Sequence, residues 1–345
     1  MGRWTFVAAM ALFVVHPASA QNTGQDRAAS RPELRTVHLA VGGRAALFYL
    51  PLTVTERLGY FRDAGLEVEI SDFQGGARAL QALMGGSADV VTGSFDHTIQ
   101  MQAKGQPVIA VVQLGRFPGF ALGLIASKGA VWRGPQDLKG MKIGVTAPGS
   151  STHFMAAYMM VRSGLKADDA SFVGVGVSST AVAAARRAEI DALVSSDPMV
   201  SLMQDEGLIR IVADTRTAEG TQTVYGGPYP AGVLYATPAF LEKNPRTAQA
   251  MVGAFLRGLK WIATHSAEDI AKLMPEDYTL GNAAVYVRAI AASKAMYSPD
   301  GRFSRDGAET ALRVLQTFDP AVKAASIDLA KTYTETFVAK AGAGN

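Results

Sequence analysis

Two stretches of sequence, GGSADVVTGSFD at residues 85–96 and RAEIDALVSSDP at residues 187–198, decide the fold. In both, an aspartate, Asp89 or Asp191, comes just before a short apolar segment that ends on small residues. An apolar segment of this kind followed by polar residues predicts a buried strand that leads into a helix. Because the two stretches align at one offset, the sequence predicts an internal repeat.

The repeat extends over residues 37–100 and 141–203. Each copy runs apolar strand, Gly- or Ser-rich loop, helix, strand, loop, helix, strand and helix. At the common offset Gly76 falls on Ser178. A duplication at the length of βαβ units predicts an α/β fold of two lobes with a cleft between them.

The order of segments also predicts how the chain divides. The first lobe takes residues 35–124 and 234–300, the second lobe takes residues 125–233, and C-terminal helices take residues 301–345. Two short apolar runs, residues 120–125 and 233–236, are predicted to cross between the lobes. Two crossings would permit a hinge.

The first twenty residues have the pattern of an export signal. Arg3 precedes an apolar run over residues 4–15, and Ala18-Ser19-Ala20 follows, which is typical of a signal peptide cleaved after Ala20. Residues 21–34 are polar and are predicted to be a disordered lead-in. We therefore expect a periplasmic protein, with a retained N-terminal anchor as the alternative.

Composition excludes several classes of function. The chain has no cysteine, so it has no disulfide, thiol nucleophile or cysteine metal site. The formal net charge is +3 with dispersed basic residues, which argues against a nucleic-acid partner. The histidines lack metal-site spacing, and no serine-hydrolase elbow or phosphate loop is present, so we expect no metal, no cofactor and no enzyme.

Loops at helix starts are the candidate ligand site. In parallel α/β lobes, ligands bind beyond the carboxyl ends of the strands. Helix starts favour an anion or the negative pole of a zwitterion, although each such residue can also serve only as a cap. The candidates are Gly43, Arg44, Gly75, Gly76, Ser94, Phe95, Asp96 and His97 in the first copy, and Gly149, Ser150, Ser151, Thr152, His153, Ser196 and Asp197 in the second.

Further side chains near these loops have the chemistry to hold a ligand. Arg44 and Arg116 could pair with a carboxylate or sulfonate. Asp96 and Asp197 could hold an ammonium group, and His97 could meet His153 across a closed cleft. Candidate aromatic walls are Tyr225 and Tyr229, in a loop rich in Gly and Pro.

Several phrases in the first 145 residues resemble a known family. They are LFYLP at 47–51, LGYFRDAGL at 58–66, FQGG at 73–76, ALMGGSAD at 82–89 and DLKGMKIGV at 137–145. Their order and spacing are similar to those of the nitrate, sulfonate and taurine type of periplasmic binding proteins of ABC importers.

This resemblance implies a type II periplasmic binding protein fold, with a ligand trapped between the lobes in the loops named above. It also implies a permease and its ATPase as partners, and we expect a monomer. Our first candidate ligand is a sulfonate or another compact organic anion, with or without an amine. An aromatic acid or a pyrimidine-type thiamine precursor remains open.

Two other functions stay open. Fungal pyrimidine synthases of thiamine biosynthesis are a related branch that shares the fold and consumes its own histidine. Those enzymes carry a cysteine-rich motif, which this chain lacks. A sensory protein would have a signalling partner in place of the permease.

Overall fold

The computed structural model describes residues 1, 2, 4, 31–129 and 131–342. Its contacts divide the chain into two units, Met1–Arg31 and Pro32–Asn345, and the fold described below is that of the second unit. Most of the export signal predicted over residues 1–20 and most of the predicted lead-in over residues 21–34 fall outside the described residues. Within the described part of the chain, no helix is long and apolar enough to cross a membrane.

The first of two five-stranded sheets has the order β2-β1-β3-β10-β4. Its strands are β1 (Thr36–Val41), β2 (Glu67–Asp72), β3 (Val90–Ser94), β4 (Ile109–Gln113) and β10 (Gly232–Ala236). β1 runs parallel to β2 and β3, whereas β10 runs antiparallel to β3 and β4. β3 and β10 are buried along their whole length, so they form the centre of this lobe.

The second sheet repeats this design with the order β7-β6-β8-β5-β9. Its strands are β5 (Phe120–Ile125), β6 (Lys142–Val145), β7 (Ser171–Gly174), β8 (Ala192–Ser196) and β9 (Ile209–Asp214). β6 is parallel to β7 and β8, and β5 is antiparallel to β8 and β9. The two-lobed α/β fold predicted from the repeat is confirmed.

Asp89 and Asp191, the two aspartates that mark the repeat, make equivalent hydrogen bonds in the two lobes. The Asp89 carboxylate accepts a hydrogen bond of 2.8 Å from the backbone N–H of His38 in β1. The Asp191 carboxylate accepts an equivalent bond of 2.7 Å from the N–H of Lys142 in β6. Each aspartate therefore ties the start of its own strand to the neighbouring parallel strand.

The segments that link the two sheets are residues 114–119 and 215–231, between β4 and β5 and between β9 and β10. The predicted crossings lie elsewhere: residues 120–125 form β5 inside the second sheet, and residues 233–236 belong to β10 in the first. A boundary between residues 124 and 125 therefore falls inside a strand. Both runs are apolar because they are buried on both faces of a sheet.

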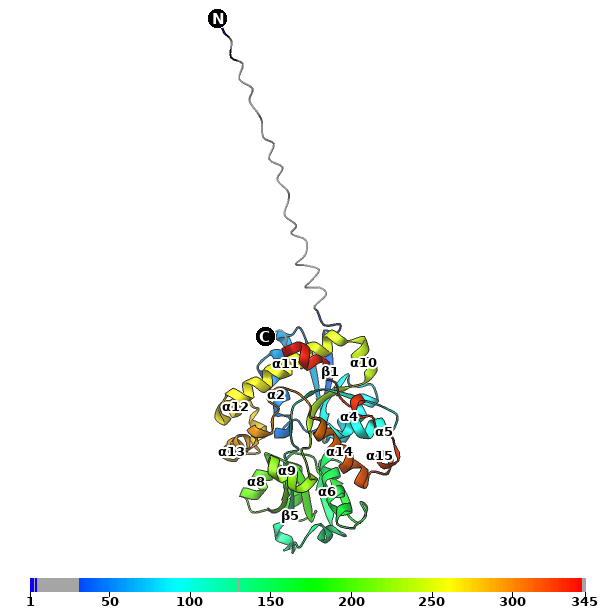
Figure 1. Ribbon diagram of the computed structural model, residues 1–345. Coiled ribbons are helices and arrows are strands. Elements are labelled where there is room, and N and C mark those ends of the chain that lie inside the picture. The colour runs from blue at the N-terminus through cyan, green and yellow to red at the C-terminus, as the bar shows by residue number, and fades with distance from the viewer. Residues whose placement is uncertain (3, 5–30, 130, 343–345) are drawn as a thin grey trace. The chain divides into compact units, whose positions relative to one another are not determined.

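Helices cover both sheets. Those that precede β10 in the chain are α2 (Leu50–Arg57), α3 (Tyr60–Asp63), α4 (Gly76–Met84), α5 (Asp96–Ala103), α6 (Ser151–Arg162), α7 (Ser179–Arg186), α8 (Met199–Asp205) and α9 (Ala218–Tyr225). The later helices are α10 (Pro238–Lys243), α11 (Pro245–Thr264), α12 (Ala267–Leu273), α13 (Ala283–Ser293), α14 (Arg305–Phe318), α15 (Pro320–Ala324) and α16 (Thr336–Gly342). Figure 1 shows α11 on the side of the first lobe and α6, α8 and α9 around the second.

The later helices brace both lobes. α11 packs on α2 and α3 of the first lobe through one apolar face, on which Met251, Phe255, Leu259 and Ile262 are buried. α13 packs on α8 of the second lobe, and α14 packs on both α5 and α6. The C-terminal part of the chain is therefore scaffold that touches both sides of the cleft.

Candidate functional site

A small cavity of about 30 Å³ lies between the lobes. This volume holds on the order of two water molecules. The cavity is lined from the first lobe by Gly42, Ala46, Phe48, Tyr49, Gly76, Ser94 and His97, and from the second by Phe120, Thr146, Ser150, Ser151, Thr152, Val177 and Ser196. Pockets for organic ligands usually measure about 300–1,000 Å³, so the lobes must separate to admit one.

Seven of the predicted site residues line this cavity, and they come from both repeats. They are Gly76, Ser94, His97, Ser150, Ser151, Thr152 and Ser196. The loops that follow equivalent strands therefore meet across the cleft, as the carboxyl ends of parallel strands require.

Hydrogen bonds cross the cleft between these loops. The N–H of Ala77, in the first turn of α4, donates to Ser150 Oγ at 3.0 Å. Ser151 Oγ donates to the Asp96 carboxylate at 2.8 Å, and the N–H of Leu47 donates to the carbonyl of Asp197 at 2.7 Å. These bonds exist only while the lobes are together, so they stabilise the closed arrangement.

Helices α4 and α6 both begin at the cavity. Ser150 precedes α6 but makes no side-chain capping bond to its own helix, since its hydroxyl faces α4 instead. Thr152 Oγ1 accepts from the N–H of Thr146 at 3.1 Å, which shapes the loop before α6. The N–H of His153 already bonds the carbonyl of Ser150, so the donors that the start of α6 offers to an anionic group are the N–H groups of Ser151 and Thr152.

Glycines allow the loops to approach this closely. A Cβ on Gly43, whose φ is +103°, would lie 2.3 Å from the Val177 side chain of the other lobe. A Cβ on Gly75 would lie 2.7 Å from the side chain of Ala147, also of the second lobe. Gly43 and Gly75 therefore contribute to the site because the lack of a side chain lets the loops of the two lobes approach each other. They do not contact a ligand through a side chain.

The two predicted carboxylates differ in their partners. Asp96 starts α5 and is fully buried, and its oxygens accept from Ser151 and, at 3.2 Å, from the Tyr229 hydroxyl. Asp197 lies 3.5 Å from the Arg216 guanidinium and accepts from the N–H of Ser201. Burial raises the pKa of Asp197, and Arg216 opposes this rise.

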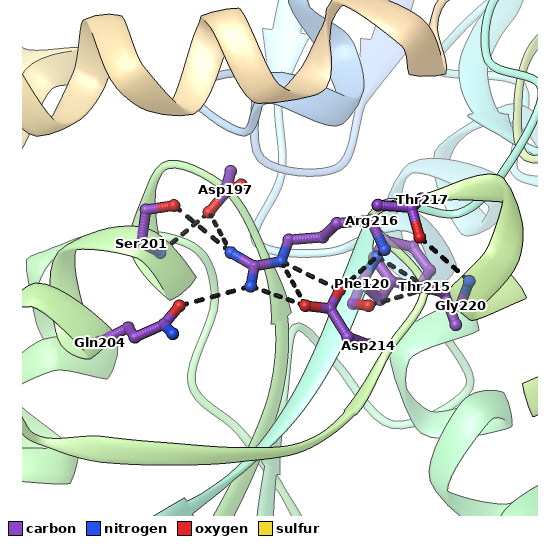
Figure 2. A network of polar contacts seen from close by, with 9 residues as sticks. All are labelled: Phe120, Asp197, Ser201, Gln204, Asp214, Thr215, Arg216, Thr217 and Gly220. Atoms are coloured by element: carbon purple, nitrogen blue, oxygen red, sulfur yellow. Dashed lines mark hydrogen bonds and ion pairs between the residues drawn. The ribbon is translucent and has the colours of Figure 1, made fainter.

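Arg216 is a residue that sequence reasoning missed. Figure 2 shows its guanidinium between Asp197 and Asp214, with Ser201 and Gln204 nearby. Its distance to the Asp214 carboxylate is 2.7 Å. The only sequence signal is its place two residues after a strand, in the kind of loop where the other candidates also lie. It fixes the loop that carries Asp197 at the edge of the cleft.

The two histidines near the cleft do not meet. His97 is fully buried, its Nδ1 lies 3.4 Å from the Tyr235 hydroxyl, and its Nε2 makes no hydrogen bond of regular geometry among the described residues. His153 accepts from the N–H of Gly149 and packs on Phe172, with ring centroids 4.1 Å apart. Burial lowers the pKa of both imidazoles, which favours the neutral form.

Five other predicted residues lie outside the cavity lining. Arg44 pairs with Glu56, and Arg116 donates to the carbonyl of Ala295 at 2.6 Å. Tyr225 and Tyr229 stack on each other, with centroids 4.3 Å apart, and Phe95 is buried in the first lobe. No lysine or arginine lines the cavity, and no cluster of three metal-binding side chains occurs in the part of the chain that is described.

Comparison with known proteins connects this geometry to a family. The NMT1/THI5-like family model matches residues 49–269. A solved structure of a protein from Bordetella bronchiseptica RB50 is 48% identical, with a TM-score of 0.89, over 91% of this chain and 99% of its own.

More distant structures share the fold. The alkanesulfonate-binding protein SsuA from Xanthomonas axonopodis pv. citri, bound to MOPS, is 18% identical with a TM-score of 0.68, over 88% of this chain and 99% of its own. The periplasmic nitrate-binding protein NrtA from Synechocystis PCC 6803 is 16% identical with a TM-score of 0.69, over 91% of this chain and 90% of its own.

Curated relatives include both a binding protein and an enzyme. YtlA of Bacillus subtilis (strain 168), whose name describes it as a binding protein, is 25% identical over 74% of this chain and 75% of its own. The 4-amino-5-hydroxymethyl-2-methylpyrimidine phosphate synthase of Aspergillus parasiticus is 24% identical over 72% of this chain and 73% of its own. Since the family model spans most of both repeats and the fold is that of periplasmic binding proteins, this chain belongs to the NMT1/THI5-like family.

Proposed function

We propose that this chain is the solute-binding component of an ABC importer. It is exported to the periplasm, captures a small organic anion or zwitterion between its lobes, and delivers it to a permease with a cytoplasmic ATPase. The observation that carries this proposal is the cavity to which both lobes contribute strand ends and helix starts. The binding proteins for alkanesulfonate and nitrate that share the fold support it.

The wall of the cavity supports a compact organic ligand of the sulfonate or taurine type. Neutral donors, such as the first N–H groups of α6 and the hydroxyl of Ser196, suit oxygens of a sulfonate or carboxylate. Phe48 and Phe120 stack with centroids 5.4 Å apart and give an apolar surface for the carbon part. An aromatic acid or a pyrimidine-type ligand is the alternative.

Capture works through the equilibrium between open and closed lobes. A ligand shifts this equilibrium only by contacts that are stronger in the closed form. Here it must replace the bonds that Ser150 and Ser151 make across the cleft. Ligand binding therefore stabilises the closed form, and a permease can recognise the surface of that form.

Native mass spectrometry of freshly purified protein tests the proposal. We expect an organic molecule of definite mass bound to the chain. Re-addition of that molecule at about one hundred times its Kd should raise the unfolding free energy by roughly 2.7 kcal/mol. Gly76→Val, which places a side chain against His97, should abolish the effect, whereas Gly253→Val, in open space on α11, should not. Retention of binding in Gly76→Val would place the ligand elsewhere.

The pyrimidine synthase relatives define the competing function. We propose that this chain is not an enzyme, because it lacks every cysteine that a cysteine-rich motif would need. Incubation of the pure protein with candidate ligands, followed by mass analysis of both protein and solution, separates the two. A new small product or a loss of mass from a histidine would refute a pure binding role.

A further inference from the structure

Asp96 is a buried carboxylate that forms no ion pair with the part of the chain that the structure describes. None of the residue is exposed, and among the described residues its oxygens accept from two neutral hydroxyls, those of Ser151 and Tyr229. Within residues 31–129 and 131–342 it takes part in no ion pair. Neutral hydrogen bonds offset only part of the cost of burying a carboxylate, so a cationic donor at this place would be strongly favoured.

The next residue offers a second unused group. His97 lines the cavity, and its Nε2 is buried and makes no hydrogen bond of regular geometry among the described residues, although the backbone of Gly149 in the second lobe lies close to the ring. Its Cε1 would lie 3.3 Å from a Cβ at position 76, so Gly76 keeps the space beside the ring open. A buried polar atom left without a partner costs about 1–3 kcal/mol, which a bound ligand can recover.

Separation of the lobes would remove one of the two hydroxyls that cover Asp96, which is itself not among the residues lining the cavity. Ser151, whose hydroxyl covers one carboxylate oxygen, lines the cavity and belongs to the second lobe, whereas Asp96 and His97 belong to the first. When the lobes separate, this hydroxyl leaves with its own lobe. Asp197 offers no equivalent place, since Arg216 already pairs with it.

We propose that Asp96 and His97 select a ligand that carries a protonated amine. The ammonium group donates to the Asp96 oxygen that Ser151 occupies in the closed form, and His97 Nε2 bonds a neighbouring polar group of the same ligand. This inference rests on the proposed function, because it needs a ligand in the cleft. It narrows the ligand class from organic anions in general to compact zwitterions with an amine.

Matched pairs of probes test this selection by isothermal titration calorimetry. The pairs are 2-aminoethanesulfonate against ethanesulfonate, and 4-aminobutanoate against butanoate. Wild type should bind the amine member of a pair about 10- to 100-fold more tightly, as expected for a charged hydrogen bond. Asp96→Asn should lose this preference. Ser151→Ala should keep it, because the carboxylate is still present.

Other outcomes overturn the proposal. Equal affinity within each pair for wild type, or a preference that survives in Asp96→Asn, would exclude Asp96 as the amine site. If Asp96→Asn and Ser151→Ala lost the preference for the amine member equally, Asp96 would serve only to hold Ser151 in place. If the melting curve shows that Asp96→Asn does not fold, His97→Gln is tested in its place. This variant should bind both members of each probe pair about tenfold more weakly than wild type. Unchanged affinity in His97→Gln would count against the proposal. If wild type binds no amine probe, the amine class is excluded, while an organic mass retained in native mass spectrometry would still support the proposed function.

Discussion

Replacement of Ser150 by alanine tests whether a helix-start serine closes the cleft or only caps a helix. Its hydroxyl accepts from the N–H of Ala77 in the other lobe and makes no capping bond to α6. Loss of one neutral hydrogen bond costs about 1 kcal/mol. Because this bond exists only in the closed form, the ratio of open to closed molecules should rise about fivefold.

Fluorescence energy transfer between the lobes measures this ratio. Since the chain has no cysteine, cysteines introduced at exposed Gln81 and Lys166 are unique sites for two dyes. The matched control is Ser178→Ala, because Ser178 caps its own helix, α7, within one lobe. We expect Ser150→Ala to lower transfer without ligand and Ser178→Ala to leave it unchanged. Equal transfer in Ser150→Ala and wild type would refute the reasoning.

Three further perturbations have definite expected outcomes. Arg216→Ala leaves the Asp197 carboxylate buried without its cation. Because Arg216 is itself partly exposed, solvent weakens this ion pair, and we expect urea titrations to show a loss of about 2 kcal/mol of unfolding free energy. Gly43→Ala meets Val177 across the cleft, so calorimetry should show a loss of ligand affinity of at least about tenfold. Burial lowers the pKa of both His97 and His153, so the unfolded chain binds these protons at a higher pH than the folded chain does. The unfolding free energy should therefore fall as pH drops below about 6.5, by at most about 1.4 kcal/mol per pH unit for each histidine, and His97→Gln should remove the His97 share of this slope.

The two substitutions Arg216→Ala and Gly43→Ala each have a matched control variant. Arg187→Ala removes an exposed ion pair with Glu189 and should change stability by less than about 1 kcal/mol. Gly86→Ala keeps the positive φ strain but has nothing within 4 Å, so it should spare ligand affinity. A slope as steep in His97→Gln as in wild type, or an Arg216→Ala protein as stable as Arg187→Ala, would contradict the electrostatic reasoning.

The fold was predictable because the chain repeats itself. Asp89 and Asp191 stand at equivalent positions and bond equivalent strand starts, so alignment of two short stretches was enough to place both sheets. The links between lobes were not predictable in the same way. A short apolar run such as residues 120–125 is equally compatible with a crossing and with a buried antiparallel strand, and only pairing with β8 and β9 decides between them.

The site was predictable at the level of loops but not of side chains. Residues at strand ends converge because the topology brings those ends together. The direction of a long side chain depends on partners far along the chain: Arg44 turns to Glu56, and Arg116 turns to the carbonyl of Ala295. Arg216 was missed for the same reason, since its role depends on Asp197 and Asp214 together.

A crystal structure of the protein with its co-purified or identified ligand tests the central claim most directly. We predict the ligand between the lobes, in contact with the start of α6 and with His97, and the hydroxyls of Ser150 and Ser151 displaced from their bonds across the cleft. A ligand bound away from these residues, for example in the hollow lined by Trp132 and Val224 on the second lobe, would contradict the account.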